Sequence, residues 1–102
     1  MKTREELHQQ LLEVTGVKNI YFQPPTNTQI KYPCIVYKFD GFYYKNADDK
    51  KFAIWGRYII THIYQKYSQN LRDKLPNSFD FIDLSNTFTN DGLYHDVYTL
   101  YY

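Results

Sequence analysis

The longest regular pattern in this sequence is an alternation of side chains through residues 51–65, KFAIWGRYIITHIYQ. Large apolar side chains occupy both sets of alternating positions, and Gly56 interrupts the run near its middle. Successive side chains of a strand point to opposite faces of a sheet, so the run predicts one long strand with both faces partly covered. The glycine predicts a bulge or bend, and we expect His62 to pack on the sheet.

Four other segments have the composition of strands. Residues 17–22 are β-branched and aromatic and end just before two prolines, and residues 32–39 form the nearly continuous apolar run of a central strand. Residues 78–84 and 93–102 alternate as the long strand does, and the turn formers of residues 85–92, SNTFTNDG, separate them. With the long strand, they predict about five strands.

Residues 3–16 predict an amphipathic helix. Thr3 and Glu6 have the spacing of a capping box, and Gly16 suits the left-handed position that ends many helices. One apolar stripe lies between these caps, formed by Leu7, Leu11, Leu12 and Val14. His8 lies beside the stripe without an evident partner, and we expect it at the surface.

Residues 68–76 predict a second, shorter helix. Ser68 is the expected N-cap, Leu71 and Leu75 share one side, and Pro76 is expected to end the helix. The predicted order is therefore α-β-β-β-α-β-β in a single domain over residues 1–102. Runs of strands separated by helices predict an α+β fold, with one mainly antiparallel sheet and both helices packed on one of its faces.

Residues 40–51 join two predicted strands and combine turn formers, mixed charge and three adjacent aromatic residues, Phe42, Tyr43 and Tyr44. Exposed loops rarely keep such a group without a partner, so we expect a protruding hairpin loop that contacts another protein. The alternative is that the three aromatic residues prolong the strand into a long hairpin. Aromatic residues make up 20% of the chain, and most are tyrosine, which suits half-buried sheet faces and interfaces.

The formal net charge of +1 is too balanced for a protein whose affinity comes mainly from neutralising phosphates. Its distribution is uneven, because residues 31–74 have nine basic and four acidic side chains, whereas residues 75–102 have four aspartates and no basic residue. A positive middle and a negative end could meet on neighbouring copies of a self-assembling subunit. Solvated faces of opposite sign explain the same counts.

Cys34 is the only cysteine and lies in an apolar run, so we expect a small buried hydrophobic side chain in a reducing cytoplasm. The first residues form a charged helix rather than a signal sequence, and no apolar run approaches 18 residues. We therefore expect neither secretion by a signal peptide nor a membrane span.

Motifs of known chemistry are missing from the sequence. It has no glycine-rich phosphate loop, no paired cysteines or histidines at metal-binding spacing and no nucleophile elbow. His95 and Asp96 are neighbours in a predicted strand and so point to opposite faces, which excludes a catalytic pair. We expect no enzyme, cofactor or metal, although a site assembled from distant residues would escape this test. Residues 37–58 interleave lysines with aromatic residues, a pattern typical of proteins that bind single-stranded nucleic acid. A nucleic-acid-binding accessory protein is therefore an alternative, although three aspartates in the same segment reduce its positive charge.

Four segments, in this order and spacing, resemble the small tail completion or tail terminator (head-tail joining) proteins of long-tailed bacteriophages of Gram-positive hosts. They are TREELHQQLLEVTGVKNIYFQPP, YPCIVYK, NADDKKF and FTNDGLYHDVYTLYY. The resemblance implies a virion structural protein of α+β fold, made in the host cytoplasm, which forms a ring, typically a hexamer. By the same resemblance we expect the ring to cap the tail tube and to bind a head-completion or connector protein, with phage DNA passing through it without specific binding. A head-side connector or neck protein is an alternative.

The expected assembly surface combines the aromatic and charged residues of the hairpin with one row of the final strand. It comprises Phe42, Tyr43, Tyr44, Lys45, Asp48, Asp49, Lys50, Lys51, Tyr94, Asp96, Tyr98 and Tyr102. In that strand we expect the row with Leu93, Val97 and Tyr101 to seal the core. A competing hypothesis places the carboxylates of Asp80, Asp83, Asp91 and Asp96 along the DNA passage, where like charge would keep DNA from binding.

Overall fold

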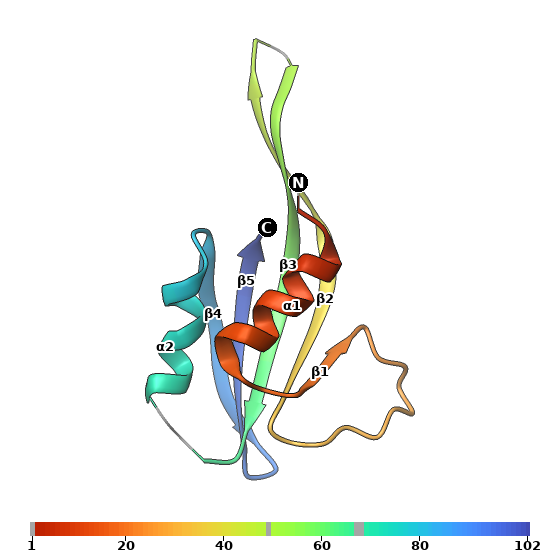
Figure 1. Ribbon diagram of the computed structural model, residues 1–102, viewed down its shortest axis with the longest axis vertical. Helices are drawn as coiled ribbons and strands as arrows, with labels where there is room; N and C mark the ends of the chain where they lie inside the picture. The colour runs from red at the N-terminus through yellow and green to blue at the C-terminus, as the bar shows by residue number, and fades with distance from the viewer. Residues whose placement is uncertain (1, 49, 67–68) are drawn as a thin grey trace.

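The computed structural model describes residues 2–48, 50–66 and 69–102, and for residues 47, 51, 52 and 69–71 it describes the backbone alone. The described residues form an α+β fold, as predicted, and their elements follow the predicted order (Figure 1). These elements are α1 (Arg4–Thr15), β1 (Asn19–Phe22), β2 (Cys34–Ala47), β3 (Lys50–Tyr64), α2 (Gln69–Ser78), β4 (Ile82–Asn90) and β5 (Leu93–Tyr101).

The strands form one mixed sheet in the order β1-β2-β3-β5-β4. Neighbours from β2 to β4 are antiparallel, but β1 runs parallel to β2, with Asn19 opposite Cys34 and Phe22 opposite Tyr37. The sheet is therefore mainly antiparallel, as predicted, but the parallel pairing of β1 with β2 was not predicted. The segment between the two strands returns along the sheet without forming a helix, so β2 starts at the same end as β1 (Figure 1).

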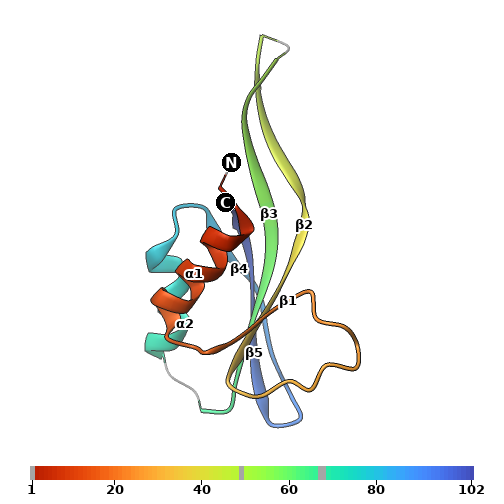
Figure 2. The ribbon, with the colours of Figure 1, turned by 45° about the vertical axis from the view of Figure 1, so that its right-hand side comes forward.

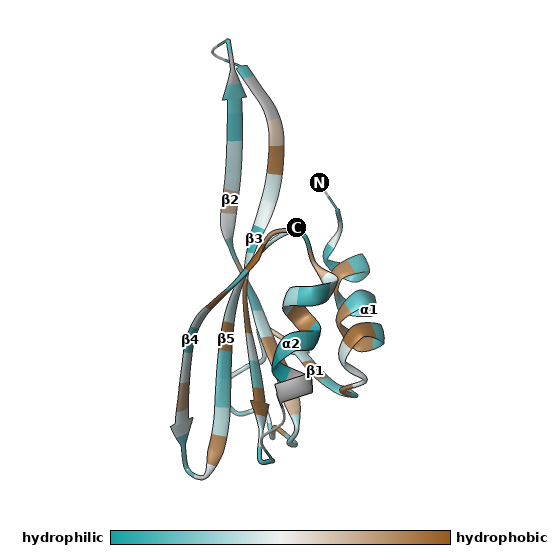
Figure 3. Cartoon of the chain, turned by 90° about the vertical axis from the view of Figure 1, so that its left-hand side faces the viewer, coloured by the Kyte–Doolittle hydropathy of each residue, from teal (hydrophilic) through white to brown (hydrophobic). Residues whose placement is uncertain are grey.

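Both helices lie on one face of the sheet, which Figures 2 and 3 show from two sides. Leu7 and Leu11 of α1 and Leu75 of α2 are fully buried against this face. The strands contribute Ile35, Tyr37, Tyr58, Ile60, Tyr98 and Leu100 to the core, and Val17, Phe79 and Tyr102 join it from outside the strands. No helix in the described part of the chain combines the length and hydropathy needed to cross a bilayer.

The predicted caps of α1 are confirmed. The Thr3 hydroxyl accepts the backbone N–H of Glu6 at 3.2 Å, and Gly16, at φ 68°, donates its N–H to the carbonyl of Leu12 at 2.9 Å. His8 differs from the expectation of a surface histidine without a partner. Its Nδ1 lies 2.8 Å from the hydroxyl of Tyr37, so it links the helix to β2.

Helix α2 continues past Pro76, which was predicted to end it, and reaches Ser78. A proline inside a helix lacks the N–H that would bond the carbonyl four residues earlier. That carbonyl belongs to Arg72, and the hydroxyl of Tyr98 on β5 donates to it at 2.9 Å. The sheet thus replaces the missing donor. Ser68, the predicted N-cap, lies outside the described residues.

The hairpin of β2 and β3 projects beyond the rest of the sheet, and the molecule measures 50 × 30 × 23 Å (Figure 1). Residues 40–51 therefore form the alternative that we considered, a long hairpin, and not a protruding loop. Strand β2 runs to Ala47, and β3 begins at Lys50. The predicted irregularity lies beside Gly56, where residues 40 and 41 of β2 face the single residue Arg57 of β3, so the extra residue is in β2. A second register shift, between Lys45 and Asn46, leaves an extra residue in β3. Gly56 is closely packed: a Cβ there would lie 3.0 Å from the Tyr58 ring.

Candidate protein interaction surface

The projecting part of the hairpin, residues 42–47 and 50–55, is called the ribbon below. Strand β1 accompanies β2 only as far as Tyr37, and β5 accompanies β3 only down to Arg57, with a last pair of backbone bonds between Gly56 and Tyr102. Beyond these points β2 and β3 pair with each other alone among the described strands. The ribbon is therefore a two-stranded extension of a five-stranded sheet.

Aromatic and aliphatic side chains are exposed on the helix side of the ribbon. Phe42 keeps 44% of its surface exposed, Tyr44 41% and Ile54 39%. Tyr44 and Ile54 are cross-strand partners and share a face, and the Phe42 ring lies 6.2 Å from that of Tyr44. Phe39, at the base, contacts Phe42 edge to face at 5.0 Å. Phe42, Tyr44 and Ile54 are called the helix-side row below. The ribbon itself extends beyond both helices (Figure 1).

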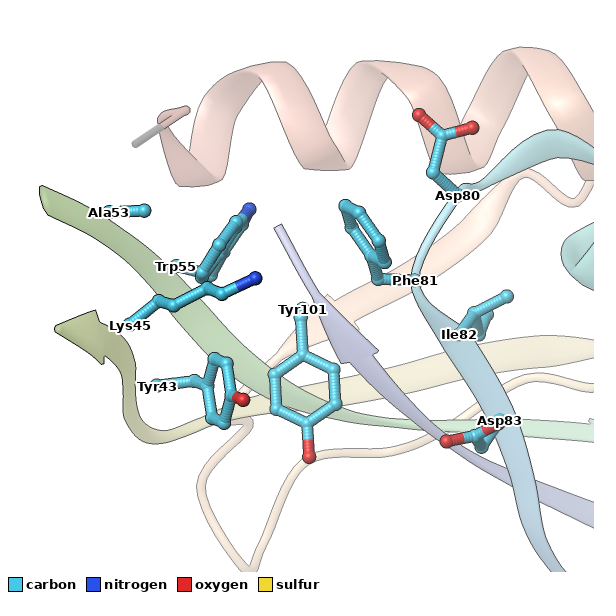
Figure 4. Close-up of a pocket in the computed structure, with 9 residues that line it drawn as sticks. All are labelled: Tyr43, Lys45, Ala53, Trp55, Asp80, Phe81, Ile82, Asp83 and Tyr101. Carbon is cyan, nitrogen blue, oxygen red and sulfur yellow. The ribbon is translucent and has the colours of Figure 1, made fainter. Parts of the chain in front are cut away.

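The opposite side of the ribbon base contains an aromatic groove of about 640 Å³. Tyr43 and Trp55 are cross-strand partners whose rings lie 5.7 Å apart, and Tyr101 of β5 meets Tyr43 edge to face at 5.3 Å. Phe81 lies 5.9 Å from Trp55 and is 56% exposed. Figure 4 shows these four rings around the groove.

Charged side chains of both signs line the aromatic groove. Lys45 extends from the ribbon beside Trp55, while Asp80 approaches from the segment before β4 and Asp83 from β4 itself (Figure 4). The basic middle and the acidic end of the sequence therefore already line one groove within a single molecule. The groove has two carboxylates and one ammonium group, so its charge disfavours a phosphate backbone.

The structure brings the predicted residues of the hairpin together on the ribbon. Phe42, Tyr43, Tyr44 and Lys45 are exposed in β2, as are Asp48 and Lys50 near the turn. For Lys51 only the backbone is described, in β3, and Asp49 lies outside the described residues. The predicted contact residues of this region thus lie where another protein can reach them.

The predicted row of the final strand is wrong as an assembly surface. Asp96 and Tyr98 are fully buried, Tyr102 is 8% exposed and Tyr94 is half-buried, because this row faces the helices. Tyrosine suits the core here because its hydroxyl finds partners, as that of Tyr102 does in donating to Gln10 Oε1 at 2.7 Å.

The other row of β5, which includes Leu93, Val97 and Tyr101, was predicted to seal the core and instead faces away from the helices. The alternation itself was correct. Cross-strand partners share a face, and Tyr98 lies opposite the fully buried Ile60 of β3. The sequence pattern does not say which of two mixed rows the helices cover.

Asp96 is the centre of a buried polar cluster. Its carboxylate accepts hydrogen bonds from Tyr64 at 2.7 Å, from Thr87 at 2.8 Å and from the guanidinium of Arg72. Burial alone would raise the pKa of Asp96, but these bonds and the charge of Arg72 outweigh it and lower that pKa. Asp96 is therefore excluded from both hypotheses for the acidic residues, a subunit interface and a DNA passage. Asp80, Asp83 and Asp91 are exposed.

Trp55, Phe81 and Tyr101 line the aromatic groove but were missing from the predicted surface. They come from three separate segments, and the groove exists because β5 lies between β3 and β4 in the sheet. The alternation of side chains in the sequence predicts the strand face on which each of them lies. It does not predict the strand order that brings them together. His95, whose ring stacks on Phe88 at 4.6 Å, lies on the face opposite to Asp96, as the alternation predicts.

A scan against protein-family models, a search of curated proteins and a search of solved structures each found no significant match to this chain.

Proposed function

We propose that this chain is a non-enzymatic structural protein of a long-tailed bacteriophage, a tail terminator that assembles as a ring on the tail tube and joins tail to head. The observation that supports it most directly is the ribbon, whose aromatic side chains are exposed on both of its faces. The sequence resemblance to tail completion proteins gives the class of assembly. The ribbon gives a physical reason for assembly.

An isolated two-stranded ribbon is marginally stable in water, and exposed aromatic patches on a projecting element usually mark a protein contact. Here the helix-side row and the aromatic groove lie on opposite faces of the same ribbon. A subunit of a closed ring needs two different contact patches, one for each neighbour, besides the patch that binds the tube. Aromatic residues with a polar rim are the side chains that such contacts favour.

The experiment mixes the purified protein with tail tubes assembled from the tube protein encoded in the same genome. Negative-stain microscopy should show rings at the tube ends. Phe42→Ser and Tyr44→Ser should each reduce ring occupancy of the tubes at least ~10-fold, because each removes an exposed ring from the helix-side row. Both variants should keep the thermal stability of the parent protein within a few degrees.

Tyr32→Ser is the matched control, because Tyr32 is also 44% exposed and lies in the loop before β2. It should leave ring formation unchanged. Bare tube ends with the parent protein would contradict the proposal. Steeply salt-dependent binding to single-stranded DNA, in place of tube binding, would support the nucleic-acid-binding alternative.

A further inference from the structure

We propose that the free edge of β3 in the ribbon pairs with the free edge of β4 in a second copy of the chain, so that the sheet continues from subunit to subunit. This inference rests on the proposed function, since it specifies how neighbouring ring subunits join. Four observations support it: the direction of the backbone groups in the ribbon, the ribbon's lack of a third strand, the exposure of β4 and the charges of the two edges.

The first observation is that, beyond Gly56, one side of β3 pairs with no described strand. Gly56 exchanges backbone bonds with Tyr102, at 3.0 and 2.8 Å, so its N–H and C=O point toward β5. Backbone groups alternate sides along a strand, so those of Trp55 point toward β2 and those of Ile54 point to the free side. Among the described residues, no strand pairs with residues 50–55 on this side of β3.

The second observation is that no third strand of the described chain pairs with the ribbon, although a third strand usually gives a sheet its independent stability. Its side chains cannot compensate, since Phe42, Tyr44 and Ile54 are each more than a third exposed. An added strand on β3 would supply backbone hydrogen bonds and would widen the apolar surface on both faces of the ribbon. A contact between side chains alone would leave the edge of β3 unpaired.

The third observation is the exposure of β4, which forms one edge of the sheet. Every residue from 83 to 90 is exposed, and the apolar side chains of Leu84 and Phe88 are more than 40% exposed. Natural edge strands are usually protected by lysine, by proline, by a bulge or by being short. Strand β4 has nine residues and contains neither lysine nor proline, and its one register shift, between Leu84 and Asn86, leaves residues 86–90 in regular pairing. The opposite edge, β1, has only four residues.

The direction of the backbone groups in β4 follows from its turn. Asn90 and Leu93 flank the two-residue turn formed by Asp91 and Gly92, both of which have positive φ. Such flanking residues bond each other, so alternation points the N–H of Thr89 away from β5 and toward the free edge. The N–H of Thr87 points the same way and binds the side chain of its neighbour Asn86 at 2.9 Å.

The fourth observation is that the two edges differ in charge. Strand β4 and its flanks contain Asp80, Asp83 and Asp91 and no basic residue. Strand β3 begins at the exposed Lys50, with Lys45 on the neighbouring strand β2 and the exposed Asp48 in the turn between them. Pairing β4 with β4 would bring like charges together and would leave the ribbon uncovered. Pairing the ribbon with β4 joins two different surfaces head to tail, which is the arrangement that closes into a ring.

The test places a proline at each edge. Ile54→Pro removes the N–H that points outward from β3, and Thr89→Pro removes the one that points outward from β4, while neither removes a bond of the ladder within the molecule. Ile54→Val and Thr89→Val are the matched controls, because valine keeps the N–H and favours a strand. Circular dichroism checks the fold, sedimentation velocity measures association, and microscopy records rings on tubes.

Each proline variant should be monomeric at concentrations where the parent protein and both valine controls associate. An equimolar mixture of the two proline variants should recover a dimer and nothing larger, since one partner keeps its β4 edge and the other its ribbon edge. If a proline variant fails to fold, charge reversal tests the same contact: Lys50→Glu and Asp83→Lys should each weaken association, and mixing them should restore it.

Rings on tubes that persist in both proline variants would overturn the strand pairing and leave the proposed function standing. An Ile54→Pro protein that still dimerises through β4 would overturn it too, since it would indicate a symmetric β4 contact. A parent protein that stays monomeric at every concentration, and also with tubes, would overturn both proposals.

Discussion

Arg72 of α2 binds Asp96 of β5 at two points: its Nη2 lies 3.2 Å from Oδ1, and its Nε lies 3.3 Å from Oδ2. The Asp96 side chain is fully buried, whereas that of Arg72 is 23% exposed. Because a carboxylate loses its hydration on burial, this ion pair and the hydrogen bonds from Tyr64 and Thr87 make the position of Asp96 tolerable. The pair thereby fixes α2 on the sheet.

Replacing the cation of this pair should strongly destabilise the protein. Arg72→Met leaves a buried carboxylate without its counter-ion, so we expect the free energy of unfolding to fall by about 3 kcal/mol. The matched control is Lys74→Met, an exposed lysine two residues along the same helix, which should change it by less than about 0.5 kcal/mol. Urea denaturation measures both, and equal effects would show that the ion pair is not what holds α2.

The hydroxyl of Tyr98 should matter because of Pro76. Tyr98→Phe leaves the carbonyl of Arg72 without a donor, and we expect a loss of about 1–2 kcal/mol in unfolding free energy. Pro76→Ala restores a helical N–H that can reach the same carbonyl. In that background Tyr98→Phe should cost about 1 kcal/mol less, which a double-mutant cycle by urea denaturation measures. An identical loss in both backgrounds would mean that the proline does not create the need for Tyr98.

The local elements of this fold could be predicted from the sequence because each depends on neighbouring residues. The caps of α1 at Thr3 and Gly16 and the turn before β5 need only a few adjacent side chains. The end of α2 could not be predicted in this way. It depends on a hydroxyl from β5, which lies more than twenty residues away in sequence.

The candidate site was predicted in part for the same reason. The exposed aromatic side chains of the ribbon are adjacent in sequence, so their composition alone indicated a contact surface. The aromatic groove needs Phe81 and Tyr101 beside Trp55, and this depends on the strand order. Which row of β5 the helices cover depends on packing, since both rows mix apolar and polar residues.

The thiol of Cys34 should be unreactive in the folded protein. The side chain is fully buried, and burial raises the pKa of the thiol to about 11. At about pH 8, roughly one thiol in a thousand would then be ionised, and alkylation by iodoacetamide should be at least ~100-fold slower than in urea-denatured protein. Mass spectrometry follows the reaction at this single cysteine. Similar rates in both states would indicate that β2 opens readily at its start.

Stability should fall as the pH drops through the range in which histidine ionises, because of His62. This side chain is fully buried, and neither of its ring nitrogens has a hydrogen-bond partner among the described residues. Burial lowers the pKa of His62, the positive charge of Lys74 lowers it further, and the carboxylate of Asp96 opposes both without reversing the shift. The folded protein therefore keeps this ring neutral at a pH where the unfolded chain already binds a proton.

The sign of the effect follows from that difference. The contribution of the neutral ring is complete above the unfolded pKa of about 6.5 and is lost as the pH falls below it. Between about pH 7.5 and 5.5 we expect a loss of about 1 kcal/mol in unfolding free energy by urea denaturation. His62→Met removes the titrating group and should reduce this loss, while His8 and His95 are the same in both proteins. An unchanged pH dependence in the variant would assign the effect to other groups.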